Sequence, residues 1–570
     1  MQTKTRWNLN SIYPSLNSTE LSKDIEILKN SIESFHHKLN TLTIDKIKDK
    51  EIIDLIKEYE KIIEKNRKIQ AFIICLLSVE SKNEEAQKIK GHLYNLSSSL
   101  KLLDLKLEKI ISQTNINTPE YKYFIELSIE NNKHRMKDEE EELYSLLSVS
   151  SNSEWKSLYN ELISNIKVDF ENQIISISQL RNYYNHSNRE IRKKAYRKEI
   201  EIFKEYEYIF SRILNSVKWD SVVISKKRNF SSVLEQSLFY NQIDKEILDV
   251  VINTTFENLS MVRKYFHKKA KFLGLEKLDW FDLSAPIFEK EVETFDFEKA
   301  QKFILESFAE FSDDMCLMAK EAFENGWIDA EPRIGKADGG FCIYVFDKQS
   351  RILVNFDNSI KSVLTLAHEL GHAYHNWVMS ENTPLFRHSP LILAETASIL
   401  AETITRKNAI KLAKNQYTKA QILDGYLYTV SIVVVDIMSR FIFEDKVINI
   451  RKERTLSPSE LCSIMLDSQY EVYVDSINSY HPYMWANKPH YYSSNYYNYP
   501  YLCGLLIGLS LYNLFENKKI TANDYRDILK NTAKDKPERI LKSIGLDIRT
   551  KEFWQEAFNR IEKDIQEYLE

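Results

Sequence analysis

The chain has 570 residues, of which 43% are hydrophobic and 28% charged. This composition predicts a globular protein with a large buried core and excludes a disordered chain. The formal net charge of −5 is spread over mixed signs, so we expect no nucleic-acid and no membrane partner. The five cysteines are scattered and no apolar run follows the N-terminus, which favours reduced thiols in a cytoplasmic protein. We also expect a monomer.

The first half of the chain has few of the glycines and prolines that the turns of a β-rich fold need. It contains one glycine and two prolines between residues 1 and 273. Apolar residues recur at steps of three and four from Leu21 to Leu39, which is the period of an amphipathic helix. We therefore predict an N-terminal domain of antiparallel helices over residues 1–200 and a second domain over residues 201–570.

The pattern of the sequence changes near residues 280–286, where we expect a junction between two parts of the chain. Three glycines within six residues then precede two β-like runs, residues 341–346 and 351–356, with a turn between them. Asn358 or Ser359 can cap the helix that follows. Helical patterns then continue to the C-terminus, and the apolar run near residues 430–435 is far too short to span a bilayer. The predicted fold is mostly α, with one small hairpin.

The helix after the hairpin carries the sequence His368-Glu369-Leu370-Gly371-His372. Two histidines four residues apart lie on the same face of a helix, so both imidazoles can bind one metal ion. Glu369 projects beside that metal and can take a proton from a metal-bound water. This is the HExxH pattern of zinc peptidases, although a bare match also occurs by chance on ordinary helices with buried histidines.

A catalytic zinc ion needs a third protein ligand, and Glu395 is the best candidate. It lies 23 residues after His372, which leaves room for a turn and a second helix that brings its carboxylate back over the histidines. His375 is the competing ligand, but the chain lacks the glycine turn and longer spacing of a three-histidine motif. His375 is better explained as a packed polar residue or as a partner of a ligand. Ser398 and Glu402 can orient the ligands from one and two turns further on, although Glu402 is equally well explained as an exposed helix position.

A segment dense in hydroxyl donors, residues 489–501, lies near the C-terminus. Peptide hydrolysis at a metal leaves a developing oxyanion that a phenol or imidazolium can stabilise. His490 and Tyr499 are the first candidates for this role, with Tyr496 next. A tyrosine-rich core or cleft wall is the alternative, and spacing alone favours that alternative.

Residues 365–373, followed by Ala394-Glu395-Thr396-Ala397-Ser398, resemble the oligoendopeptidase F group of the thimet-oligopeptidase-like zinc metallopeptidases. The likeness touches nearly the whole chain. It includes Trp7-Asn8-Leu9 with Ile12-Tyr13-Pro14, residues 227–238, Gly339-Gly340-Phe341-Cys342, Val354-Asn355-Phe356, His490 and Tyr496-Tyr497-Asn498-Tyr499.

The resemblance implies a zinc-dependent endopeptidase that cleaves internal bonds of short unstructured oligopeptides. By it, one zinc ion is bound by His368, His372 and Glu395, Glu369 is the base that assists attack by zinc-bound water, and His490 and Tyr499 contact the carbonyl oxygen or the substrate backbone. Its fold is almost all helical, with two halves around a deep channel. Gly339, Gly340 and Tyr496 are candidate substrate-binding residues, and the free edge of the hairpin could pair with an extended peptide.

Two other functions compete with an endopeptidase. A zinc carboxypeptidase or dipeptidyl carboxypeptidase would need a cation to hold the free C-terminal carboxylate, and Arg387 is one candidate. An inactive peptide-binding protein could keep the fold, but a binder needs neither a full ligand set nor a base such as Glu369.

Overall fold

Helices build the N-terminal part, as predicted. The structure, a computed structural model, describes residues 5–43, 47–114, 116, 118–288 and 294–570. Ser18 caps the first helix by accepting a hydrogen bond from the Leu21 backbone, and the predicted apolar stripe from Leu21 to Leu39 is its buried face. The first helices are α1 (Thr19–Thr41), α2 (Asp49–Val79), α3 (Glu84–Ser112) and α4 (Lys122–Lys133).

Two apolar cores divide the described chain. The smaller contains buried residues from Ile12 to Ile125 together with Val345, Phe386 and Ala533, and the larger runs from Tyr159 to Tyr568. The predicted boundary at residue 200 is corrected, because it falls inside the single continuous helix α8 (Arg189–Lys227). The other helices up to residue 324 are α5 (Asp138–Ser148), α6 (Glu154–Asn165), α7 (Ile177–Asn182), α9 (Val233–Tyr240), α10 (Lys245–Phe272), α11 (Phe297–Ala309) and α12 (Asp313–Glu324).

A second hairpin, missed from the sequence, interrupts the N-terminal helices. Strand β1 (Lys167–Phe170) pairs antiparallel with β2 (Gln173–Ser176). The two residues between them, Glu171 and Asn172, have φ angles of 50° and 62°, as a tight hairpin turn requires. A turn with glutamate in place of the usual asparagine or glycine gives little signal in the sequence.

The predicted hairpin before the metal-binding helix is present, with a shorter second strand. Strand β4 (Phe341–Phe346) pairs antiparallel with β5 (Gln349–Leu353), which in turn pairs with the short β3 (Ile328–Asp329). The strand order β3-β5-β4 leaves β4 at the edge of the sheet, as expected for a strand that could receive a peptide.

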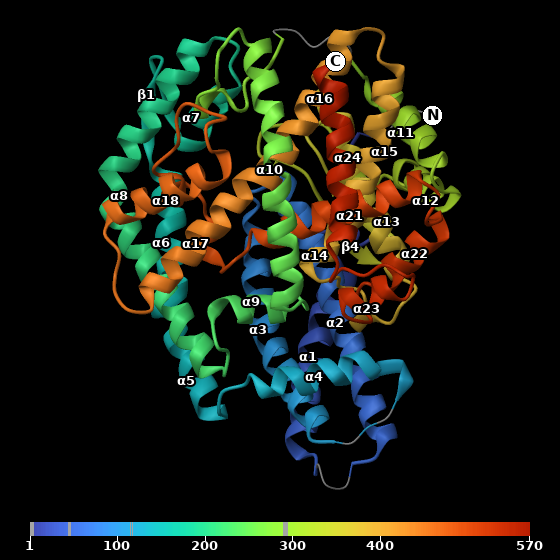
Figure 1. The fold of residues 1–570 in the computed structure, drawn as a ribbon. Helices are drawn as coiled ribbons and strands as arrows, with labels where there is room; N and C mark the ends of the chain where they lie inside the picture. Colours follow the sequence, from blue (N-terminus) through green and yellow to red (C-terminus); the bar gives the residue numbers. More distant parts are fainter. Residues whose placement is uncertain (1–4, 44–46, 115, 117, 289–293) are drawn as a thin grey trace.

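Helix α13 (Ile360–Met379) packs against α11 and α12 and against strands β4 and β5. Figure 1 shows α13 close to α15 (Thr396–Leu412), with α21 (Tyr499–Glu516) and β4 near by. Residues 416–451 are long and apolar enough to cross a membrane by length and composition, but 67% of their most apolar 18 residues are buried within the protein, as expected for a core helix. The remaining helices are α14 (Leu391–Ala394), α16 (Gln416–Ser431), α17 (Ile437–Arg451), α18 (Pro458–Tyr473), α19 (Met484–Asn487), α20 (His490–Ser493), α22 (Ala522–Asn531), α23 (Pro537–Lys542) and α24 (Lys551–Leu569).

Candidate metal centre

Helix α13 presents both predicted histidine ligands on one face. Ser359 precedes the helix, and its hydroxyl accepts a hydrogen bond from the Ser362 backbone. Ser359 rather than Asn358 is therefore the N-cap. His368 and His372 follow one helical turn apart, with ring centroids separated by 5.0 Å. Both imidazoles therefore lie on one face of the helix, as their spacing in the sequence predicts.

Gly371 allows a second helix to come close enough to supply the third ligand. A Cβ atom at this position would lie 2.6 Å from both the Ala397 carbonyl oxygen and the Ser398 Cα, which are backbone atoms of α15. Only glycine permits this approach, and it brings Glu395, immediately before α15, over the histidines. The HExxH pattern alone gives no role to Gly371, although a glycine inside a helix is a recognisable signal of close packing.

The three predicted ligands converge on one point. His368 Nε2 and His372 Nε2 lie 3.3 and 3.4 Å from the same Glu395 oxygen, Oε2. Among the described residues these three form a cluster of potential metal ligands whose donor atoms all lie within 4.8 Å of one another. Two ligand atoms about 2.0–2.2 Å from a tetrahedral zinc ion are about 3.4 Å apart, so the spacing fits that metal.

Three neighbouring side chains have the positions expected of supporting residues. His368 Nδ1 lies 3.1 Å from the Glu402 carboxylate, and Ser398 donates a hydrogen bond of 2.8 Å to Glu395 Oε2. Glu402 thus orients a ligand, and the alternative of a plain exposed position is wrong. His375 Nε2 lies 2.9 Å from the Thr532 hydroxyl, and burial lowers its pKa to about 4. It is a packed neutral residue and not part of the cluster.

Opposite charges dominate the electrostatics of the cluster. Burial alone would lower the pKa of His368, but hydrogen bonds to Glu395 and Glu402 raise it to about 10. The two histidines hold the pKa of Glu395 well below its usual range, although burial opposes this. In the absence of a metal the cluster therefore retains protons that a bound cation displaces.

Glu369 lies in a cavity of about 480 Å³ that contains the whole cluster. Its side chain is only 7% exposed, and burial raises its pKa. The edge of β4 borders the same cavity through Gly340 and Phe341. A Cβ at Gly340 would lie 3.0 Å from the Glu369 carboxylate, so this glycine leaves room for the predicted base, whereas Gly339 is not among the residues that line the cavity.

Arg387 also lines this cavity, which the sequence could not establish. Its guanidinium donates a hydrogen bond of 2.7 Å to Glu64 and another to the Tyr344 hydroxyl. The cation is therefore already paired with a carboxylate from α2, which weakens the case for it as the anchor of a substrate's C-terminal carboxylate.

Tyr496 and Tyr499, which were predicted to contact the substrate, do not line the metal cavity. Tyr496 donates its hydroxyl to Asp445 and is 2% exposed, while the Tyr499 hydroxyl accepts from Ser237 and its side chain is 1% exposed. Neither lines the metal cavity, so the expected contacts of these two hydroxyls with a carbonyl oxygen or substrate are absent from this conformation. Both are core residues; Tyr499 is the first residue of α21, and Tyr496 lies three residues before that helix.

Tyr497 and Tyr501 connect His490 to the region of the metal cluster. The His490 ring stacks on Tyr497 at 4.7 Å, and the hydroxyl of Tyr501 donates to that of Tyr497 at 2.8 Å. Burial raises the pKa of Tyr501, and the charge of Glu395 contributes to that rise. Burial lowers the pKa of His490, and its Nδ1 has no hydrogen-bond partner among the described residues.

Two imidazoles and a carboxylate around one point, with a buried second carboxylate beside them, define a metallopeptidase of the HExxH class. Comparison with known families agrees. The model of peptidase family M3 matches residues 182–560 and that of oligopeptidase F matches residues 100–167. The chain therefore belongs to peptidase family M3, and it is a metalloendopeptidase that hydrolyses oligopeptides.

Known proteins resemble the chain along its full length. An oligoendopeptidase F homolog from Borreliella burgdorferi is 26% identical, over 97% of this chain and 96% of that protein. The fold is similar to that of a Chlamydophila abortus protein described as a peptidase, with a TM-score of 0.83 at 23% identity, covering 99% of this chain and 98% of the other. Oligoendopeptidase F from Enterococcus faecium has a TM-score of 0.69 at 17% identity, covering 96% and 98%.

Proposed function

We propose that this metalloendopeptidase uses one zinc ion, held by His368, His372 and Glu395. The observation that carries the proposal is the spacing of 3.3 and 3.4 Å between the histidine nitrogens and one Glu395 oxygen. Two imidazoles and one carboxylate suit zinc better than magnesium or calcium, which prefer oxygen ligands alone. A bound zinc ion supplies a Lewis acid that polarises the scissile carbonyl and activates water.

Glu369 is the general base in this proposal. Its carboxylate lies inside the metal cavity, where it can accept a proton from the attacking water and deliver it to the departing amine. Glu402 keeps the His368 ring oriented, and Ser398 fixes the Glu395 carboxylate. A hydrogen-bond donor for the carbonyl oxygen is best sought in the group formed by His490, Tyr497 and Tyr501, since the Tyr499 hydroxyl is engaged by Ser237.

The experiment that tests this function uses an internally quenched peptide of about ten residues, blocked at both ends. Internal cleavage, seen by mass spectrometry of the products, should disappear with a chelator and return with zinc. Glu369→Gln should keep its zinc and lose about 10²- to 10⁴-fold in turnover. Glu324→Gln, the same change in an exposed ion pair on α12, is the control. Full activity of Glu369→Gln would refute the assigned base, and cleavage only of a free-ended twin peptide would indicate an exopeptidase.

We also propose that the enzyme acts as a cytoplasmic monomer on short, unstructured peptides. All five cysteines are free thiols, which supports a reducing compartment. The metal cluster lies in a cavity that suits an extended segment better than a folded protein surface. Comparing cleavage of one sequence as a free peptide and within a folded host tests the size limit, and gel filtration tests the oligomeric state.

A further inference from the structure

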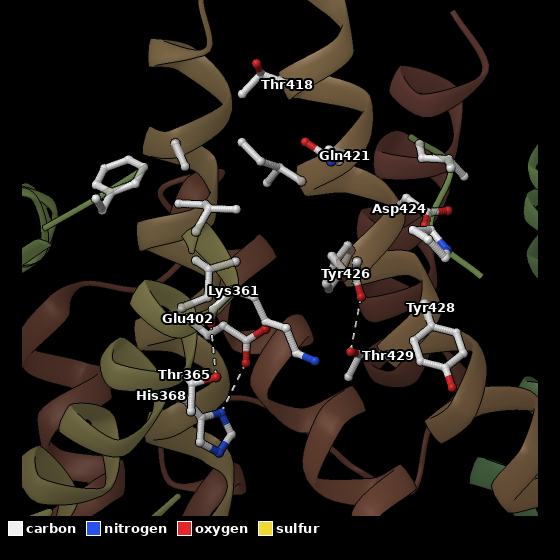
Figure 2. A pocket seen from close by; sticks show the side chains of 18 of the residues that line it. Lys361, Thr365, His368, Glu402, Thr418, Gln421, Asp424, Tyr426, Tyr428 and Thr429 are labelled. Atoms are coloured by element: carbon white, nitrogen blue, oxygen red, sulfur yellow. Dashed lines mark hydrogen bonds and ion pairs between the residues drawn. The ribbon is translucent and has the colours of Figure 1, made fainter. Parts of the chain in front are cut away.

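A second cavity adjoins the metal centre on the far side of His368. It has a volume of about 720 Å³, within the range of ligand pockets, and His368 and Glu402 contribute to its wall. Figure 2 shows these two residues at one end of the cavity, joined by their hydrogen bond. A group bound at that end of the cavity would therefore contact a side chain that also lines the metal cavity.

Carbon atoms dominate the lining of this cavity. Apolar side chains from α11, α13, α15 and α16 line it, including Phe303, Leu364, Leu412 and Ile422, and Phe295 lines it from just before α11. An extended peptide that reaches the metal can lower its free energy by placing a large apolar side chain against this wall, because apolar surface then leaves water.

The charged side chains of the lining include four lysines and three carboxylates, and this excess of positive charge does not suit a basic substrate side chain; they are Lys269, Lys299, Lys302, Lys361, Glu306, Glu402 and Asp424. Glu402 is bonded to His368, and Asp424 forms a 2.9 Å ion pair with Lys269 and accepts hydrogen bonds from two tyrosine hydroxyls. Lys361 forms no ion pair with any carboxylate in the part of the chain that the structure describes, and Figure 2 shows its ammonium extending into the open middle of the cavity. That positive charge opposes the entry of lysine or arginine.

We propose that this cavity is a specificity subsite that accepts one large apolar side chain of the substrate, within two residues of the cleaved bond. The proposal deepens the proposed function, because it names the residue class that a peptide must present there. A zinc peptidase without such a subsite would cut with little preference near the bond.

Gly425 of α16 offers a way to fill the cavity without disturbing the fold. It lines the cavity, and a Cβ at this position would meet no atom within 4 Å. Gly425→Phe should therefore occupy the subsite, whereas Gly425→Ala adds only a methyl group. Gly91→Phe is the matched control, because Gly91 is also helical, has no atom within 4 Å of a built Cβ, and lies in the distant helix α3.

The test scans blocked decapeptides, each carrying alanine, leucine, phenylalanine, glutamate or lysine at one position near the bond. Wild type and Gly91→Phe should prefer leucine or phenylalanine over alanine at one position, by about tenfold or more in kcat/KM. Gly425→Phe should lose that preference at that position alone. An unchanged profile, an equal loss on every peptide, or a preference for glutamate there would overturn the proposal.

Binding of the same blocked peptides to Glu369→Gln, measured by calorimetry, separates this proposal from the proposed function. In that background Gly425→Phe should weaken binding of the leucine peptide about tenfold or more and leave the alanine peptide unchanged. If wild type cleaves nothing but this loss is seen, the subsite stands and the proposed function fails. If binding of the two peptides does not change, the subsite is refuted whatever the activity.

Discussion

Gly371→Ala directly tests how the metal centre is built. In an exposed helix, replacing glycine by alanine stabilises a protein by about 1 kcal/mol. At Gly371 the new methyl group would lie 2.6 Å from two backbone atoms of α15. Carbon atoms normally approach no closer than about 3.5 Å, so the two helices would have to separate by about 1 Å.

A separation of that size has a specific chemical consequence. Glu395 immediately precedes α15, and the histidines are on α13, so the carboxylate would move away from both imidazoles. Metal sites tolerate displacements of about 0.2 Å, and a misplacement of 1 Å at a catalytic centre costs about 10²-fold in rate. We expect Gly371→Ala to bind zinc at least tenfold more weakly, to lose about 100-fold in kcat/KM, and to be destabilised by about 1–3 kcal/mol through overpacking.

Zinc affinity by competition with a chromogenic chelator, activity on the quenched peptide and urea unfolding measure these three effects. Gly91→Ala and Gly425→Ala are the controls, since both glycines are helical with no atom within 4 Å of a built Cβ, and both variants should be slightly more stable. Normal zinc affinity and activity in Gly371→Ala would refute the claim that this glycine sets the distance between the helices.

Other perturbations test the supporting network, the buried charges and the role of the metal in the fold. Glu402→Ala should lower zinc affinity about 10- to 100-fold in the chelator competition, because the partner of His368 Nδ1 is lost; unchanged affinity would show that this partner is dispensable. Glu199 is buried, and although burial opposes the shift, Arg181 and His481 lower its pKa from 4.5 to about 2. A carboxyl with a lowered pKa stabilises the fold above about pH 4.5, and about 3 kcal/mol should be lost as the pH falls through 4.5 toward 2. Urea unfolding should therefore depend less on pH in Glu199→Gln over that range, and equal slopes would contradict the assignment. Chelation should lower the Tm by a few degrees, because the metal joins α13 to α15, and it should leave the Tm of His372→Ala unchanged.

The sequence by itself determined the chemistry of the centre. The spacing of His368 and His372 fixes two ligands on one helical face, because the helix repeat is nearly four residues. The 23 residues before Glu395 are enough for a return helix, and the carboxylate does lie over the histidines. The helical character, the hairpin before α13 and the family resemblance were also correct, since periodicity and short motifs record local structure directly.

Only the tertiary structure decided which side chains share a cavity. The sequence suggested Tyr496 and Tyr499, but tertiary packing directs these two hydroxyls toward Asp445 and Ser237. The boundary at residue 200 failed for a similar reason, because α8 belongs entirely to the larger core and no local signal marks where one core ends. Contacts between segments distant in sequence decide the close packing at Gly371, the place of Arg387 in the metal cavity and the apolar cavity beside His368. Only the folded chain brings these segments together.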